Sequence, residues 1–379
     1  METYPAVFES EEQAAFRDTC RRFAEREIAP RIDEAERTGV YPRELRLKAA
    51  EADLLGICTS PEHGGAGAPL IFQCIAVEEF SSVCAGLATG LNSLGLRVLD
   101  QEGTSEQKAR YLKPANQGKI GSAFAMTEPG AGSDVLAMRT TAIREGNGWR
   151  IKGNKLYATG APCSDFMMVA AYTDKKKRRD GVSLFIVDTD AEGVEIHKMD
   201  KLGHHAMETG NVFLDCALPA DALIGEPGMG MAYIMKLLEG GRITHAARSL
   251  GVARGALDLA IEYAKERETF GKTINKYQAI GMKLAQMMTD LRTAHLHVYS
   301  AAAKYDAGSP TLLEACMAKL VASEASVSIT DQAMRIFAGV GYINDAPIQR
   351  FFRDARLYPI SEGTNEIQLR TIARLGDII

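Results

Sequence analysis

The feature that most constrains the fold of this chain is a hydrophobic periodicity that changes twice along its length. Before about residue 118 and after about residue 229, apolar residues recur at helical spacing. Between Ile120 and Leu223, apolar and β-branched runs alternate with turn dipeptides such as Asn147-Gly148, which is typical of antiparallel strands. The sequence therefore predicts a mainly α-helical protein with one inserted β block.

This order predicts three domains. We expect an N-terminal α-helical domain over residues 1–118, a middle antiparallel β domain over 119–228 and a C-terminal α-helical bundle domain over 229–379. Ser10 and Gln13 form a capping-box pattern that opens the first helix. Further helices are expected at residues 42–55, 71–115, 233–238, 242–267, 276–307 and 310–338, and from residue 365 onward.

Composition excludes several classes of function. The formal net charge is −5, so the basic surface expected of a nucleic-acid-binding protein is not indicated. Seven cysteines lack the close pairing of a zinc site, and we expect reduced thiols and a cytoplasmic location. We also expect no secretory leader at the N-terminus. No apolar run approaches eighteen residues, so no membrane span is expected.

A single carboxylate near the C-terminus, Glu362, stands between a turn bounded by Pro359 and the start of a helix. Gly363 allows a sharp bend there, and Thr364 or Asn365 can cap the helix. If the turn aims Glu362 inward, desolvation raises its pKa and makes it an effective base. The alternative is a charge that serves the helix dipole or faces water, and this segment alone favours that alternative.

A glycine-rich loop over residues 127–134 is the second candidate site. Gly130 and Gly132 allow close backbone approach, and Thr127 and Ser133 supply hydroxyl groups. Exposed amides in such a loop suit a pyrophosphate, although a plain turn has the same composition. No third glycine follows at the spacing of a dinucleotide-binding fingerprint.

Four segments in order carry a resemblance to a known family. They are the loop at residues 127–134, the stretch 267–272, the pair Gln278-Ala279 and the turn 362–364. Together they resemble the acyl-CoA dehydrogenases of medium- and short-chain-type architecture, over essentially the whole chain. The resemblance implies a C-terminal four-helix bundle, FAD as cofactor, and oxidation of acyl thioesters between the α and β carbons. It also implies a homotetramer built as a dimer of dimers, and electron transfer to an electron-transfer flavoprotein.

The resemblance also implies roles in cofactor binding. Residues of the same chain that would hold the flavin ring and phosphates are Phe124, Met126, Thr127, Gly132, Ser133, Tyr157 and Thr159. Residues that would reach the FAD of a neighbouring subunit are Arg267, Phe270, Gln278, Arg335 and Gly339, while Thr364 and Glu366 would approach the adenosine. Tyr157 stands where tryptophan is common, and Arg335 where glutamine is frequent.

The implied chemistry centres on Glu362, which would take the α-proton while the β-hydrogen leaves as hydride to flavin N5. The thioester carbonyl would lie between the Glu362 backbone amide and a ribityl hydroxyl of FAD. A subgroup places its base on another helix, but the matching position here is Gly241, which has no side chain. An acyl-CoA oxidase, an enoyl-CoA reductase and a non-dehydrogenating flavoprotein scaffold are the alternatives.

The sequence specifies the substrate-binding residues less closely than the cofactor-binding residues. Arg242 and Ser133 resemble residues that contact CoA, and Gly363 belongs to the thioester turn, although a carrier-protein thioester fits as well. Gly86 and Gly90, on a helix expected over 86–96, either leave room for the acyl chain or serve helix packing. Arg248 lies two helical turns beyond Gly241. We expect it to turn toward a carboxylate or carbonyl of the protein; facing the cavity, it would favour a polar or acidic acyl chain.

Overall fold

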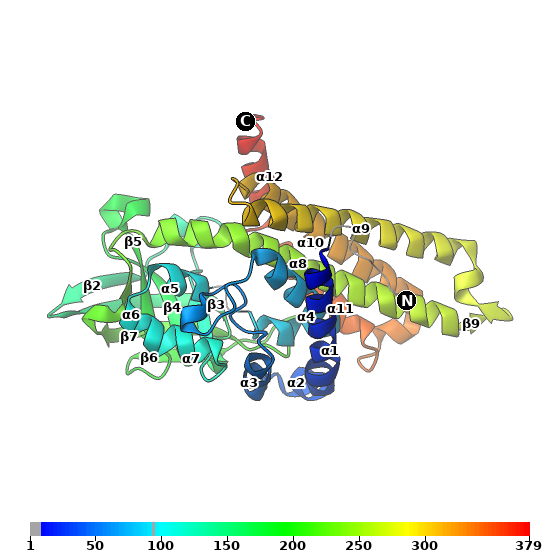
Figure 1. Cartoon of the computed structure of the whole chain (residues 1–379), viewed down its shortest axis with the longest axis horizontal. Helices are drawn as coiled ribbons and strands as arrows, with labels where there is room; N and C mark the ends of the chain where they lie inside the picture. Colours follow the sequence, from blue (N-terminus) through cyan, green and yellow to red (C-terminus); the bar gives the residue numbers. More distant parts are fainter. Residues whose placement is uncertain (1–8, 93–94) are drawn as a thin grey trace.

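The computed structural model describes residues 9–92 and 95–379 and confirms the expected order of helices, sheet and helices (Figure 1). The helices are α1 Glu11–Phe23, α2 Ile32–Thr38, α3 Glu44–Glu51, α4 Leu70–Thr89, α5 Leu96–Glu102, α6 Ser105–Gln107, α7 Lys113–Asn116, α8 Gly230–Glu266, α9 Gln278–Asp306, α10 Leu312–Phe337, α11 Ile348–Ala355 and α12 Asn365–Leu375. The strands are β1 Ser122–Ala125, β2 Thr141–Glu145, β3 Gly148–Thr159, β4 Phe166–Tyr172, β5 Val182–Asp188, β6 Val194–Lys198, β7 Thr209–Leu218, β8 Leu223–Ile224, β9 Glu268–Thr269 and β10 Lys272–Thr273.

The middle sheet has the strand order β6-β7-β3-β2-β4-β5-β8, and β1 pairs with β4. Most neighbours are antiparallel, as the turn dipeptides predict. Two pairings, β1 with β4 and β2 with β4, are parallel, so the sheet is mixed, with antiparallel pairs in the majority. Turn dipeptides report only hairpins, whereas β1 reaches its neighbour from a distant part of the chain.

Local capping and packing decide the helix ends. The capping box of Ser10 and Gln13 is confirmed at the start of α1. The helix expected over 42–55 is shorter, because α3 covers only Glu44–Glu51, and the several helices expected over 71–115 are α4 to α7. The helix expected over 86–96 ends at Thr89, with residues 93–94 outside the described range. The sequence also missed α11, a helix of eight residues.

Helix α8 corrects another expectation, because one continuous helix replaces the two expected over 233–238 and 242–267. The pair Gly240-Gly241 lies between the two expected segments. A Cβ at Gly240 would lie 2.8 Å from Nη1 of Arg97, so this glycine accommodates a close neighbour instead of ending the helix. In Figure 1, α8 runs from the sheet at one end of the chain to the β9–β10 hairpin at the other.

Helices α8 and α4 approach each other so closely that some positions on α8 have no room for a side chain. A Cβ at Gly251 would lie 2.3 Å from the carbonyl oxygen of Glu78, and one at Gly255 would lie 2.3 Å from that of Ser82. On the same surface Arg254 donates to Glu78 at 3.1 Å and to Glu79 at 2.6 Å. Glycines therefore set the helix separation, and buried ion pairs fix the register.

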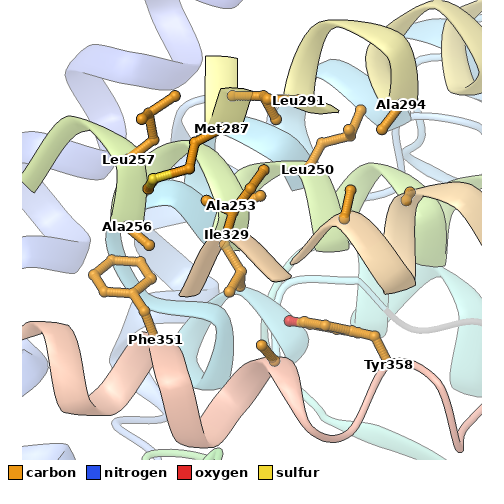
Figure 2. Close-up of a cluster of buried hydrophobic side chains, with 14 of the residues drawn as sticks. Leu250, Ala253, Ala256, Leu257, Met287, Leu291, Ala294, Ile329, Phe351 and Tyr358 are labelled. Atoms are coloured by element: carbon orange, nitrogen blue, oxygen red, sulfur yellow. The ribbon is translucent and has the colours of Figure 1, made fainter. Parts of the chain in front are cut away.

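The helical core lies where α8, α9, α10 and α11 meet. Figure 2 shows Leu250, Ala253, Ala256 and Leu257 of α8 beside side chains from the other three helices and Tyr358. This apolar cluster stabilises the C-terminal helices and supports the turn that carries Glu362.

Helix α4 has the length and mean hydropathy, 1.5, of a membrane-crossing helix, yet 72% of its most apolar window is buried inside the protein. It also carries the paired carboxylates Glu78 and Glu79. Its apolar composition is accounted for by its position as a core helix under α8.

We predict that Gly255→Ala lowers the free energy of unfolding by about 2 kcal/mol, because the new Cβ would overlap a backbone carbonyl that cannot move alone. The midpoint of urea denaturation, followed by circular dichroism, measures this change. Gly281→Ala on α9 is the matched control, because its Cβ would meet only the Asn275 carbonyl oxygen, at 3.8 Å. Equal midpoints for both variants would contradict the close α4–α8 contact.

Candidate active site

The turn between α11 and α12 presents Glu362 in an unusual backbone conformation. Glu362 has φ 55° and Gly363 has φ 83°, so two successive residues are left-handed. The side chain of Gln368 donates to the carbonyl oxygens of Glu362 at 3.2 Å and Gly363 at 2.8 Å. Thr364 caps α12 by accepting from the backbone of Ile367, which selects threonine over Asn365 as the cap. A strained non-glycine residue held by such bonds is common at functional sites.

Asn365 joins this turn to α10. Its side-chain oxygen accepts from Lys319 at 2.8 Å and from Ser323 at 3.1 Å, while its amide donates to Glu324 at 2.6 Å. Asn365 and Lys319 are both buried. The position of Glu362 therefore depends on a polar network between α10 and the start of α12.

The Glu362 carboxyl group is partly buried, and its Oε2 atom is inaccessible and has no hydrogen-bond partner among the described residues. Burial raises its pKa above the usual value, and the charges of Arg248, Arg242 and Lys319 oppose that rise. The backbone N–H of Glu362 also donates no hydrogen bond to any described residue. A carboxylate and an amide at one residue are thus both available to a ligand.

Arginines on α8 approach the same space. Nε and Nη1 of Arg242 and Nε of Arg248 are buried without partners among residues 9–92 and 95–379. The expectation that Arg248 turns toward a carboxylate or carbonyl of the protein is corrected, because no ion pair or hydrogen bond joins it to a described residue. Gly241, two turns earlier on α8, has no side chain and therefore supplies no carboxylate.

Tyr358 lies behind Glu362 between two imidazole rings. The ring centroids of His245 and His204 are 5.1 Å and 5.7 Å from that of Tyr358. Burial lowers the pKa of both histidines, so their neutral forms are favoured, and Ser361 hydrogen-bonds to His245 at 3.0 Å. The Tyr358 hydroxyl and Nε2 of His204 are buried without partners in the part of the chain that the structure describes.

The glycine-rich loop rests on a buried ion pair that the sequence did not reveal. Oε1 of Glu128 lies 2.8 Å from Nζ of Lys155, and the carboxylate also accepts from the backbone of Arg139 and Thr140. Burial favours a raised pKa for Glu128, but Lys155 and these hydrogen bonds hold the pKa below its usual value. Lys155 also donates to the carbonyl oxygen of Met126 at 3.0 Å, which joins β3 to the loop.

Away from this ion pair, the glycines of the loop have free space beside them. A Cβ at Gly130 or Gly132 would meet nothing within 4 Å, and Ser133 is exposed. Thr127 is half-buried, as are Phe124 and Met126. The loop thus provides a cradle with free glycine backbone and hydroxyl groups, which fits the phosphates of FAD.

Strand β3 carries two further residues expected at the flavin, Tyr157 and Thr159. The register between β3 and β7 shifts between Lys155 and Ala158, and Tyr157 has φ 56°. This irregularity directs the Tyr157 side chain out of the strand pattern and leaves it 62% exposed. Thr159 is exposed as well, so both residues can contact a flat ring.

Residues assigned to a neighbouring subunit's FAD lie far from this loop. Arg267 and Phe270 belong to the β9–β10 hairpin region and Gln278 begins α9, at the opposite end of the chain from the sheet (Figure 1). Phe270 is 98% exposed, an unusual state for phenylalanine. Arg335 is also exposed and pairs with Asp331 at 2.9 Å, while a Cβ at Gly339 would meet nothing within 4 Å. One chain therefore cannot bring the hairpin and the loop to one cofactor.

The structure gives Gly86 and Gly90 the second of their two expected roles, helix packing. A Cβ at Gly86 would lie 3.1 Å from that of Ala206, and one at Gly90 would lie 2.2 Å from the Tyr41 ring. The space beside both glycines is filled by other parts of the protein. Glu366, expected near the adenosine, is exposed in the first turn of α12.

Sequence reasoning missed Glu128, Lys155, Lys319 and Tyr358. Glu128 stands inside the glycine-rich loop, so its position was a usable signal. Lys155, Lys319 and Tyr358 look like ordinary strand, helix and turn residues. Burial lowers the pKa of Lys319 to about 8, but no sequence pattern indicates that burial.

Comparison with known families identifies the class of protein. Acyl-CoA dehydrogenase profiles match the N-terminal domain at residues 10–119, the middle domain at 123–217 and the C-terminal domain at 228–376. The chain belongs to the acyl-CoA dehydrogenase family. It is an enzyme of a family that uses FAD.

Particular relatives extend over the whole chain. The chain is 42% identical to the 3-(aryl)acrylate reductase of Clostridium sporogenes, over 97% of this chain and 99% of the relative. It is 40% identical to the caffeyl-CoA reductase–Etf complex subunit CarC of Acetobacterium woodii, covering 97% and 98%. It is 39% identical to the mitochondrial short-chain specific acyl-CoA dehydrogenase of Mus musculus, covering 98% and 91%.

Solved structures agree with the sequence relatives. The butyryl-CoA dehydrogenase of Megasphaera elsdenii matches with a TM-score of 0.93 and 35% identity, over 97% of this chain and 99% of that chain. A glutaryl-CoA dehydrogenase of Mycobacterium smegmatis in complex with FADH2 matches with a TM-score of 0.92 and 25% identity, covering 98% and 96%.

We predict that Glu128→Gln lowers the free energy of unfolding by about 3 kcal/mol, because it leaves the Lys155 ammonium buried and uncompensated. Guanidinium denaturation at several pH values measures this. In the wild type, the low pKa of Glu128 gives stabilisation that is present above the usual carboxyl pKa and is lost as pH falls through the folded-state pKa. The Glu128→Gln variant should lack this pH-dependent contribution to the free energy of unfolding.

Glu145→Gln is the control, since that carboxylate is exposed on β2. Equal stability of the Glu128 variant and the wild type at pH 7 would contradict a structural role for the ion pair.

Proposed function

We propose that this protein removes hydrogen from the α and β carbons of an acyl-CoA thioester, with Glu362 as the base. The observation that carries the proposal is the Glu362 carboxylate. Among the described residues, one of its oxygens is buried without a partner, and its own backbone N–H donates no hydrogen bond. Buried polar atoms are normally satisfied, so this pair is arranged for a ligand. Membership of the acyl-CoA dehydrogenase family supports the substrate class.

Proton transfer requires Glu362 to be ionised. Since burial raises its pKa, the carboxylate is more basic than an exposed glutamate and better matched to a weakly acidic α-proton. The rate of the chemical step should rise with pH as Glu362 loses its proton. The charges of Arg248 and Arg242 oppose this rise in pKa and so favour the ionised base.

The thioester oxygen gains negative charge as the α-proton leaves. The N–H of Glu362 is a fixed donor for that oxygen, and one such donor contributes on the order of 3 kcal/mol to transition-state stabilisation. The bonds from Gln368 to the carbonyl oxygens of Glu362 and Gly363 hold this donor in place. FAD, when bound, supplies the acceptor for the hydride from the β carbon.

The same proposal assigns the remaining residues. The loop at 127–134 with Tyr157 and Thr159 holds the flavin of its own chain, and Arg242 with Ser133 meets the CoA part. Phe270 and its neighbours at the far hairpin hold the FAD of a partner, within a homotetramer. The exposure of Phe270, Tyr342 at 86% and Ile379 at 79% supports covered surfaces in an oligomer.

An electron-transfer flavoprotein is the proposed electron acceptor, as the name of the Acetobacterium woodii complex suggests. The reductase names of two relatives favour a second candidate function, the reduction of an enoyl thioester at the same site. Glu362 would then deliver the α-proton instead of accepting it. Anaerobic mixing of the reduced enzyme with enoyl-CoA, beside the oxidised enzyme with acyl-CoA, separates the two directions.

We predict that Glu362→Gln slows reduction of the bound flavin by acyl-CoA roughly 1,000-fold, because the charged groups that act on residue 362 in the described chain, Arg248, Arg242 and Lys319, include no second carboxylate. Anaerobic stopped-flow absorbance at the flavin band measures the rate across pH. The wild-type rate should rise with pH through the raised pKa of Glu362, and the variant should show no such rise. Asp377→Asn, at the exposed C-terminus, is the control. Rapid reduction of the flavin in the Glu362→Gln variant would refute the assignment of Glu362 as the base.

We predict that Phe270→Ala loses at least half of its FAD, because the residue contributes to a partner's cofactor site. Flavin absorbance per chain after gel filtration measures this, and sedimentation equilibrium gives the oligomeric state. Leu202→Ala is the control, since Leu202 is 66% exposed but lies near the sheet. A wild-type monomer with one FAD per chain would contradict the shared site.

A further inference from the structure

Arg248 is a partly buried cation whose charge favours the ionised form of Glu362, but the reaction described above assigns its guanidinium no ligand. It lies on α8, two helical turns or about 10 Å beyond Gly241, and its charge and that of Glu362 act on each other. Its Nε atom is buried without a partner, and it makes no ion pair or hydrogen bond with a described residue. An uncompensated guanidinium in such a place is costly, so a partner from outside the chain is indicated.

The charged side chains around Arg248 include more cations than anions. Three cations, Arg248, Arg242 and Lys319, interact electrostatically with the Glu362 carboxylate. Of these three, only Lys319 has a hydrogen bond to another described residue. The next buried carboxylate, Asp354, accepts from the backbone of His204 at 2.6 Å. Glu362 itself lies beyond ion-pair distance of Arg248, since no N–O pair between them falls within 4.0 Å. The site therefore carries more positive than negative charge.

Two further unpartnered groups stand beside the guanidinium. The Tyr358 hydroxyl is buried without a partner, and Tyr358 and Glu362 are the charged or titratable groups that act on Arg248. Nε2 of His204, whose ring packs against Tyr358, is also unsatisfied among the described residues. A guanidinium, a phenol and a neutral imidazole together form a donor set suited to the two oxygens of a carboxylate.

We propose that the acyl chain of the substrate ends in a carboxylate that Arg248 binds, with the Tyr358 hydroxyl as a second donor. The substrate is then a short dicarboxylic acid joined to CoA through one of its carboxyl groups. This inference rests on the proposed function and names its substrate class. Glu362 removes the proton near one end of the acyl chain while Arg248 fixes the other end, so the α carbon is held in register with the base.

The test compares ligands that differ only in the terminal carboxylate. The 3-thia analogues of glutaryl-CoA and pentanoyl-CoA bind without being dehydrogenated, so calorimetry on the FAD-loaded enzyme reports affinity alone. The wild type should bind the dicarboxylic analogue roughly 100-fold more tightly, as expected for a desolvated charge-assisted pair. Arg248→Gln should bring the ratio close to one, and Arg248→Lys should keep an intermediate preference. Arg22→Gln, exposed on α1, should change neither affinity.

Equal or weaker binding of the dicarboxylic analogue by the wild type overturns the proposal, and this comparison needs no variant to fold. A preference for an aryl-acryloyl-CoA over the dicarboxylic analogue overturns it as well. Bleaching of the flavin by butyryl-CoA in the same preparation distinguishes these results from failure of the proposed function. If no acyl-CoA binds or bleaches the flavin, both proposals fall together.

Discussion

The close contact between α4 and α8 is the constraint on which the rest of the structure depends. Gly251 and Gly255 allow α8 to lie against the backbone of α4, and Arg254 closes the contact with Glu78 and Glu79. Because α8 is rigid and 37 residues long, it fixes Arg242 and Arg248 relative to the turn at Glu362. It also fixes the distance from the sheet to the far hairpin. A small change in the separation of α4 and α8 would therefore shift Arg242 and Arg248 relative to Glu362.

Polar groups in this protein follow two different patterns. Glu128 with Lys155, and Arg254 with Glu78 and Glu79, are buried charges whose partners come from the same chain. Around Glu362, by contrast, the unpartnered atoms belong to Arg242, Arg248, Tyr358 and His204 among the described residues. The first pattern stabilises the fold. The second leaves desolvated groups available to a ligand, at a cost in stability that active sites commonly carry.

The two ends of the chain divide the cofactor residues between them. The loop at 127–134 holds its open glycines on a rigid ion pair, whereas Phe270 projects from a short hairpin at the other end of α8 (Figure 1). A helix of this length separates the two groups by far more than the size of one flavin. If each chain completes a cofactor site in another, as proposed above, cofactor binding and subunit association stabilise each other.

The sequence by itself determined the succession of helices and strands and the family, and it singled out Glu362 as the candidate base. These follow from local signals: periodicity, turn dipeptides, caps and motifs at fixed spacing. The parallel pairings of β1 and β2 with β4, the unbroken α8 and the packing role of Gly86 and Gly90 depended on distant neighbours. Tertiary structure alone decided that Arg248 has no hydrogen-bond or ion-pair partner in residues 9–92 and 95–379, and that Lys155 and Lys319 are buried. Desolvation is set by what packs around a side chain and not by the residues beside it in sequence.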